Sequence, residues 1–297
     1  MIRRPPRSTH CISSAASDVY KRQFPFSPGS EISGVVSSVG EGVTMHKEGD
    51  RVMGSIGSGG LREKGVYLEQ QLMPLPETMD FHTAAGFPLN YGTTYHAFKQ
   101  RGELKAGQSV LVLGAGGGLG ITAIHIAKAM GAKVIAAASS QEKIDLCKKE
   151  GADEGIIYER EMDRDLQKKF SDQIKEVTGG GVDMIYDLVG GDYAEPALRA
   201  IARHGKYLVI GFTAGIPKMP LNLTLLKECQ IVGVFWGQFA GVEYAENQQN
   251  FKELFDLHAE GKIKPFVTET YTLDESATAI KTLEDRKVLG KVVVSME

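Results

Sequence analysis

A run of glycines between residues 114 and 120 is the part of this sequence whose residue types and spacing most directly suggest chemistry. It reads Gly-Ala-Gly-Gly-Gly-Leu-Gly and follows four apolar residues, Val110 to Leu113. A turn that admits a phosphate close to its backbone cannot carry Cβ atoms, and a helix starting there directs free N–H groups at the anion. Gly117 and Gly120 fit the last two glycines of the GxGxxG pattern, whereas Ala115 stands in the first place. We therefore predict a buried strand, a phosphate-binding turn and a helix, with an ordinary glycine loop as the alternative.

The second strand of this unit, Lys133 to Ala138, ends where an NAD site would carry an acid that bonds the ribose 2′-hydroxyl. The chain has Ser139 and Ser140 there, with Lys143 three residues later. Hydroxyl groups and an ammonium suit a 2′-phosphate, which a carboxylate would repel. We therefore predict NADPH as the cofactor. The alternative is that a serine only caps the helix of residues 141–150 and that Lys143 is a solvated charge, although capping and phosphate binding are compatible.

The length and composition predict a protein with two domains and a small-molecule ligand. The chain has 297 residues, 42% of them hydrophobic, and a formal net charge of −3. This charge gives no general attraction to nucleic acid or membranes, and no run is long and apolar enough to span a bilayer. Cys11, Cys147 and Cys229 form no CxxC pair, which favours reduced thiols over a disulfide framework or a structural zinc site. We expect a soluble, cytoplasmic protein without a nucleic-acid or membrane partner.

Residues 1–23 differ from the rest of the chain. They carry five basic residues and one acid, which gives this segment a net charge of +4. Because the whole chain has a net charge of −3, the other 274 residues carry −7. An arginine- and serine-rich start with few acids would fit a mitochondrial transit peptide, which would make the location mitochondrial. The segment from Asp18 to Gln23 is, however, what GAT GTG TAT AAG AGA CAG encodes, and this resembles the transposon end used in sequencing libraries. We expect residues 1–23 to be a non-native leader.

Strand and helix signals alternate beyond the glycine unit, as a doubly wound parallel sheet requires. We expect strands at residues 155–158, 182–189, 206–210 and 231–237, and helices at residues 163–178, 193–202, 243–260 and 276–286. Ligands of such sheets lie at the carboxyl ends of the strands. We therefore expect five residues beside the nicotinamide, with plain core packing as the alternative for each: Val189, Gly211, Phe212, Phe235 and Trp236.

From Phe24 to its C-terminus the chain resembles the zinc-independent NADPH:quinone oxidoreductases of the medium-chain dehydrogenase/reductase superfamily. The resemblance rests on the ordered motifs PGSEISG, GDRV, GTTYHA, AGGGLG, YDLVGG, IGF, FWG and LGK. It implies an α/β fold, in which a Rossmann doubly wound parallel sheet (96–264) is joined to a GroES-like β-barrel domain (24–95 and 265–297). The earliest strands of the barrel have no counterpart here. We therefore expect an incomplete barrel and an N-terminally truncated chain.

The resemblance also implies roles for single residues. Thr93 would lie near the nicotinamide; Gly117, Gly118 and Leu119 would lie at the pyrophosphate, and Ser139, Lys143 and Tyr158 at the 2′-phosphate. Tyr158 could equally be a half-buried strand end. Arg286 and Lys291 would approach the cofactor with the tail of the chain, or be surface charges. No general acid is assigned, so the catalytic residues stay unknown and the proton would come from solvent or a hydroxyl.

The function implied is hydride transfer from NADPH to a quinone or another electrophilic enone or carbonyl. Zinc-dependent relatives carry a histidine before the glutamate of the first motif, where this chain has Ser30 before Glu31, so we expect no metal. The alternatives are an enoyl-thioester reductase of the same fold, an inactive truncated fragment that binds nucleotide without catalysis, and an RNA-binding relative, which the acidic globular part disfavours. The family also suggests a homodimer paired through the strand around residues 232–235.

Overall fold

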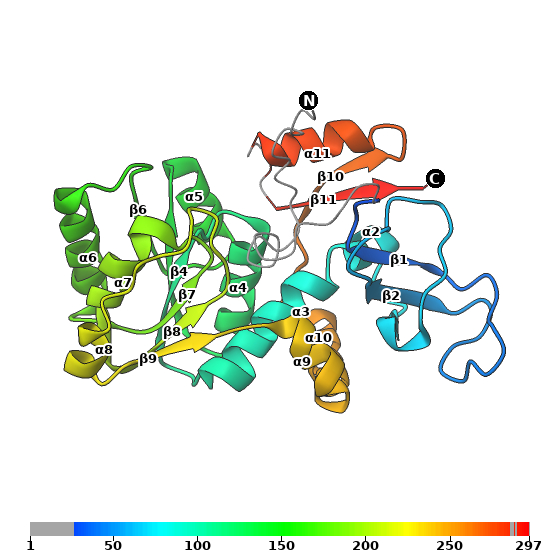
Figure 1. Cartoon of the computed structure of the whole chain (residues 1–297), viewed down its shortest axis with the longest axis horizontal. Coiled ribbons are helices and arrows are strands. Elements are labelled where there is room, and N and C mark those ends of the chain that lie inside the picture. Colours follow the sequence, from blue (N-terminus) through cyan, green and yellow to red (C-terminus); the bar gives the residue numbers. More distant parts are fainter. Residues whose placement is uncertain (1–26, 286–287, 289, 297) are drawn as a thin grey trace, which may run out of the picture.

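A parallel sheet of six strands dominates the computed structural model, which describes residues 27–285, 288 and 290–296 (Figure 1). The strands are β4 (Ser109–Leu113), β5 (Lys133–Ala138), β6 (Glu154–Ile157), β7 (Val182–Asp187), β8 (Ile201–Val209) and β9 (Gln230–Gly233). They lie in the order β6-β5-β4-β7-β8-β9. Successive strands are thus added on one side of β4 up to β6 and on its other side from β7 onward. At such a reversal of strand order, a ligand crevice is expected at the carboxyl ends of β4 and β7.

Helices cover both faces of this sheet. They are α4 (Gly118–Ala129), α5 (Gln141–Lys149), α6 (Arg164–Thr178), α7 (Ala194–Arg199) and α8 (Asn222–Lys227). Alternate residues of β4 enter two separate hydrophobic cores: Val110 and Val112 pack on the α4 side, whereas Leu111 and Leu113 pack on the α6 and α7 side. This alternation follows from the two-residue period of a strand. The predicted α/β fold with a doubly wound parallel sheet is confirmed.

The other part of the molecule joins two segments that are far apart in sequence. Its first segment forms an antiparallel sheet of β1 (Glu31–Val35), β2 (Arg51–Ser55) and β3 (Leu72–Pro74), followed by α2 (Phe81–Ala85). Its second segment is β10 (Val267–Thr272), α11 (Ser276–Glu284) and β11 (Lys291–Ser295), in which the two strands are parallel. Figure 1 shows this C-terminal unit returning to lie beside β1 and α2. Within the described residues the two small sheets are not hydrogen-bonded into one barrel.

A group of helices lies between the two parts (Figure 1). These are α3 (Pro88–His96), the π-helix η2 (Ala97–Gly102), α9 (Trp236–Val242) and α10 (Tyr244–Ala259). Aromatic rings hold them together, because Phe87 stacks on Tyr91 with ring centroids 4.3 Å apart and lies 6.3 Å from Phe251. These helices connect the six-stranded parallel sheet to the two small sheets.

Three predicted elements were wrong at one end. The strand expected over residues 231–237 ends at Gly233, and α9 begins at Trp236. The helix expected over residues 193–202 ends at Arg199, and β8 begins at Ile201 rather than at Lys206. Ile201 pairs with Val182 and is fully buried, so burial against the neighbouring strand overrides the helical pattern of the sequence.

Candidate functional site

The glycine turn after β4 leads into a helix whose first N–H groups are free. Gly114 adopts a φ of +77°, and α4 follows the N-cap residue Gly117, which supplies no side-chain cap. The N–H groups of Gly118, Leu119 and Gly120 have no acceptor among the described residues. Gly120 must be glycine, because a Cβ there would lie 2.4 Å from the Ala115 carbonyl oxygen. The turn therefore presents backbone donors and the positive helix end to an anion.

The residues predicted for a 2′-phosphate lie next to this turn. The aliphatic stem of Lys143 packs over the turn, since a Cβ on Gly116 would lie 2.8 Å from the Lys143 Cβ. Its ammonium has no partner within the described part of the chain. The Ser140 hydroxyl accepts the Lys143 N–H at 3.4 Å and caps α5, which is the capping role weighed above, and Ser139 is left beside a small hollow.

Tyr158 lies beside Ser139 at the end of β6. Its N–H donates to the Ala138 carbonyl at 3.0 Å, and its half-buried ring packs against Tyr193, with centroids 4.8 Å apart. Burial raises the pKa of the Tyr158 phenol. Sequence reasoning missed Arg160, which borders the same hollow as Ser139 and whose backbone carbonyl accepts the Tyr193 hydroxyl at 2.8 Å. A cation two residues beyond Tyr158 was the available signal.

A buried carboxylate organises the ends of β7 and β8. Asp187 accepts the N–H groups of Val189 at 2.7 Å and Gly190 at 2.9 Å, and the Tyr207 hydroxyl at 2.6 Å. Burial raises the pKa of Asp187, although these three donors favour its ionised form. The Val189 side chain reaches the glycine turn, because a Cβ on Gly114 would lie 3.0 Å from it. The loop that Asp187 fixes therefore borders the turn.

Gly211 and Phe212 lie at the same edge of the sheet. The Gly211 N–H donates to the Asp187 carbonyl at 3.2 Å, and a Cβ on Gly190 would lie 3.1 Å from the Phe212 ring. The sheet thus brings Val189, Gly211 and Phe212 together at the carboxyl ends of the central strands, as predicted from the pattern of strands.

Phe235 and Trp236 do not end a strand. Trp236 is buried against Gly92 of α3, and its indole N–H donates to the Asn247 side chain at 2.9 Å. The core-packing alternative therefore describes Trp236. Phe235 is 64% exposed and belongs to neither the core nor the edge that holds Val189.

Helix α3 and the C-terminal segment both contact the start of α4. Thr93 lies on α3 and is partly exposed, one turn beyond the buried Asn90. A Cβ on Gly118 would lie 3.2 Å from the Asn90 side-chain nitrogen and 3.0 Å from the Gly290 carbonyl oxygen. Sequence reasoning missed Asn90 and Gly290. The only signal for Asn90 was an amide within the apolar start of a helix.

Lys291 is neither a surface charge nor free to reach a ligand. Its ammonium forms an ion pair with Glu31, whose side chain is 7% exposed and also accepts the Leu89 N–H at 2.8 Å. This pair joins β11, β1 and the start of α3. Arg286, the other tail residue predicted to approach the cofactor, lies outside the described residues.

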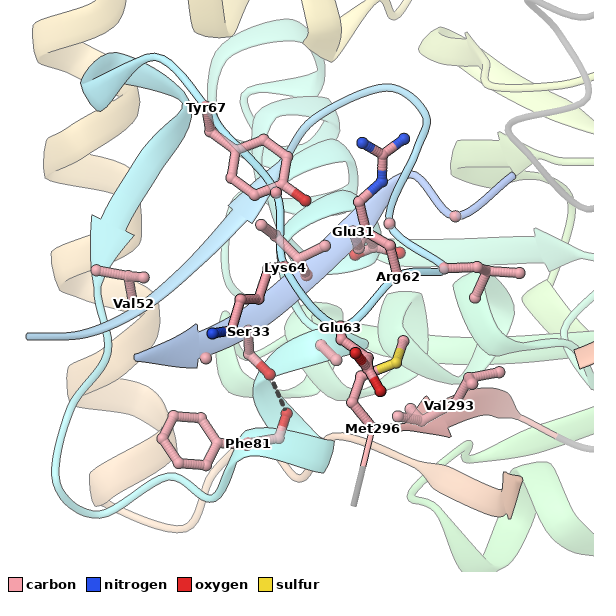
Figure 2. Close-up of a pocket in the computed structure, with 18 of the residues that line it drawn as sticks. Glu31, Ser33, Val52, Arg62, Glu63, Lys64, Tyr67, Phe81, Val293 and Met296 are labelled. Atoms are coloured by element: carbon pink, nitrogen blue, oxygen red, sulfur yellow. Dashed lines mark hydrogen bonds between the residues drawn. The ribbon is translucent and has the colours of Figure 1, made fainter. Parts of the chain in front are cut away.

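A cavity also opens in the smaller part of the molecule. A space of about 1050 Å³ opens between β1, β2, the loop of residues 60–67 and β11 (Figure 2). Figure 2 shows the side chains of Tyr67, Phe81 and Val293 around it, and Ser33 donating to the Phe81 carbonyl at 2.5 Å. Of the residues predicted to bind cofactor, Lys291 alone lines this cavity within the described part of the chain. Gly290, whose carbonyl lies against the start of α4, also lines the cavity.

The described residues contain no group of three or more His, Cys, Asp or Glu side chains arranged to hold a metal ion. Within the same ranges, no helix combines the length and the apolar character needed to cross a membrane. Cys147 and Cys229 are buried free thiols.

Comparison with known proteins identifies both parts of the chain. The family model described as zinc-binding dehydrogenase matches residues 118–260, and that of the alcohol dehydrogenase GroES-like domain matches residues 8–77, which confirms the expected GroES-like part. Quinone oxidoreductase-like protein 2 of Bos taurus is 36% identical over 279 residues, which are 93% of this chain and 78% of the relative.

Quinone oxidoreductases themselves are also similar. That of Rattus norvegicus is 34% identical over 284 residues, covering 94% of this chain and 83% of the relative. The structure of Escherichia coli quinone oxidoreductase complexed with NADPH superposes with a TM-score of 0.84 at 28% identity, covering 94% of this chain and 86% of that chain. The chain therefore belongs to the quinone oxidoreductase family of the medium-chain dehydrogenase/reductase superfamily.

Proposed function

We propose that this protein binds NADPH and catalyses hydride transfer to a quinone or another electron-poor enone or carbonyl, without zinc. The observation that carries the proposal is the uncapped start of α4 with the Lys143 stem packed over its turn. Free backbone donors suit a pyrophosphate, and the Lys143 ammonium, which pairs with no described residue, suits a 2′-phosphate. A similar protein, the Escherichia coli quinone oxidoreductase, has been solved in complex with NADPH.

The residues divide into groups by what they would hold. Gly117, Gly118 and Leu119 would bind the pyrophosphate, and Ser139, Lys143 and Tyr158 the 2′-phosphate. Thr93, Val189, Gly211 and Phe212 would orient the nicotinamide. Bound NADPH supplies the hydride from C4 of its nicotinamide ring. The protein's contribution is then positioning, because holding the ring against an acceptor removes much of the entropic cost of the reaction.

The donor set at the first motif supports the proposed zinc independence. Ser30 stands where a zinc ligand would precede Glu31, and the Glu31 carboxylate is already occupied by Lys291 and the Leu89 N–H. The test is NADPH oxidation with 1,4-benzoquinone before and after exhaustive chelation. We expect the rate to survive chelation. Loss of the rate, restored by zinc, would contradict this part of the proposal, and oxidation only with an enoyl thioester would favour the alternative substrate class.

We also propose a homodimer formed through β9, a cytoplasmic location, and domain limits of 24–95 with 265–297 for the barrel-like part and 96–264 for the nucleotide part. β9 is an edge strand, and Leu225, Leu226 and Phe235 near it are largely exposed. Such an edge with apolar neighbours is suited to pairing with a second copy. Sedimentation equilibrium at micromolar concentration should give twice the mass of the chain, and a monomer mass would contradict the dimer.

A further inference from the structure

Asn90 is a nearly buried residue whose side-chain amide makes no hydrogen bond to any described residue. It is 5% exposed, and no described residue pairs with its side chain. Two other buried asparagines of the molecule are satisfied: Asn247 accepts the Trp236 indole, and Asn250 bonds both Lys99 and Gln100. Neither polar atom of the Asn90 side chain is among the fully buried atoms without a partner in the described residues, so the small exposed part of Asn90 includes its amide. Polar groups in nearly buried positions are usually paired, because burial without a hydrogen bond is costly. The Asn90 amide is therefore open to a ligand and is not used by any described residue.

The Asn90 amide lies against the start of α4. Its nitrogen would be 3.2 Å from a Cβ on Gly118, the first residue of that helix. The N–H groups around this point have no acceptor among the residues that the structure describes, and Asn90 adds another donor from a different helix. The Gly290 carbonyl borders the same point but accepts no hydrogen bond from Asn90. The N–H groups at the start of α4 and the Asn90 amide together suit a ligand that carries several acceptor oxygens, such as a pyrophosphate.

We propose that the Asn90 side chain donates a hydrogen bond to a pyrophosphate oxygen of the bound dinucleotide, so that α3 binds the ligand together with α4. The inference rests on the proposed function and names a further cofactor-binding residue. Because NADPH and NADH share the pyrophosphate, Asn90 strengthens the binding of both equally. Lys143, which is proposed to hold the 2′-phosphate, acts on NADPH alone.

The test compares Asn90→Leu with the matched control Asn250→Leu, both in the full chain. Thermal unfolding without ligand and calorimetric titration with NADPH and with NADH are measured for each. Leu has a similar branched shape and needs no hydrogen bond, so N90L should keep or raise the unfolding temperature. It should lower the affinity for NADPH and for NADH by about tenfold or more, which is the loss expected when a hydrogen bond to a charged group is removed. N250L should lower the unfolding temperature and leave both affinities unchanged.

Each opposite result overturns the inference. If N90L lowers the unfolding temperature as N250L does and binds both nucleotides normally, Asn90 is a structural residue. A second variant, Asn90→Asp, keeps the shape but brings a negative charge to the pyrophosphate, and it should bind neither nucleotide measurably; normal binding by N90D also overturns the inference. Failure of the unmutated chain to bind either nucleotide would instead overturn the proposed function, and this inference with it.

Discussion

Asp187 shows how a single residue can shape the candidate site without touching a ligand. Its carboxylate is 1% exposed and carries three hydrogen bonds, two from the loop that contains Val189 and one from Tyr207. One oxygen accepts both backbone N–H groups and the other accepts the phenol. The loop geometry therefore depends on acceptors at this position more than on the negative charge.

Asp187→Ala and Asp187→Asn should consequently differ. Alanine leaves three buried donors without an acceptor and should cost ~3 kcal/mol or more of unfolding free energy. Asparagine keeps an oxygen for the two N–H groups and offers its amide to the Tyr207 oxygen, so its loss should stay within ~1 kcal/mol. Urea denaturation of the three proteins gives these values. Equal losses would show that the charge, and not the set of acceptors, matters.

His125 couples stability to pH. It is 7% exposed, and its Nε2 lies 2.8 Å from the Glu150 carboxylate while its Nδ1 lies 3.4 Å from the Tyr91 hydroxyl. Burial lowers the pKa of His125, and this outweighs the opposing effect of Glu150. The unfolded chain therefore takes up a proton first as the pH falls below the usual histidine pKa of ~6.5. Stability is present above that pH and is lost as the pH falls toward the folded pKa.

His125→Gln should flatten this dependence. The variant lacks the titrating ring, so its unfolding temperature should fall less than that of the unmutated protein between pH 7.5 and pH 5.5. Some dependence should remain, because burial also lowers the pKa of His96. Calorimetry at both pH values measures the slopes, and identical slopes would mean that His125 does not contribute.

Elements were predictable where local pattern and burial agree. The strand, turn and helix around the glycines, the cap of α6 at Asp163 and its end at Gly179 all follow from local rules, and the structure has them. The boundary of β9 and α9 was not predictable, because the apolar run past Gly233 satisfies strand and buried helix alike. Packing of Trp236 against Gly92, more than a hundred residues away in sequence, decides it.

The positions of single residues were likewise predictable only where they follow from local pattern. Ser139 and Tyr158 follow the adjacent parallel strands β5 and β6, so their position at one edge of the sheet was predictable, whereas Lys143 lies in the first turn of α5. The shared role of the three residues at a 2′-phosphate stays a prediction. The ion pair of Lys291 with Glu31 could not be foreseen, since it joins the two ends of the described chain and depends on the return of β11. Asn90 was missed for a similar reason, because its proposed role in ligand binding depends on its contact with the start of α4, which only the folded structure shows.

The close approach of α4 to its turn gives a prediction for that element. Gly120→Ala places a methyl group 2.4 Å from the Ala115 carbonyl oxygen, which forces the helix start away from the turn. We expect a loss of ~1 to 3 kcal/mol in stability and weaker binding of both nucleotides. Gly241→Ala in α9 is the control, since no atom lies within 4 Å of its added methyl group. A G120A variant that matches G241A in both measurements would refute the close approach.

At the scale of the whole molecule, the Glu31 and Lys291 pair ties the C-terminal strand to the first strand and to α3. Lys291→Met leaves the nearly buried Glu31 carboxylate without its cation, and we expect a loss of ~3 kcal/mol in unfolding free energy. Adding Glu31→Gln removes the unpaired charge and keeps an acceptor for Leu89, so the double variant should regain part of the loss. A double variant no more stable than K291M would contradict the idea that a stranded charge causes the damage.

The central claim is that the edge of the six-stranded sheet binds NADPH through a 2′-phosphate site beside the glycine turn. Its most direct test is the dissociation constant of NADPH and of NADH for the unmutated chain and for Lys143→Ala. We predict that the unmutated chain binds NADPH at least about tenfold more tightly, as a charge-assisted contact implies, and that K143A weakens NADPH alone. Equal or tighter binding of NADH by the unmutated chain would contradict the account.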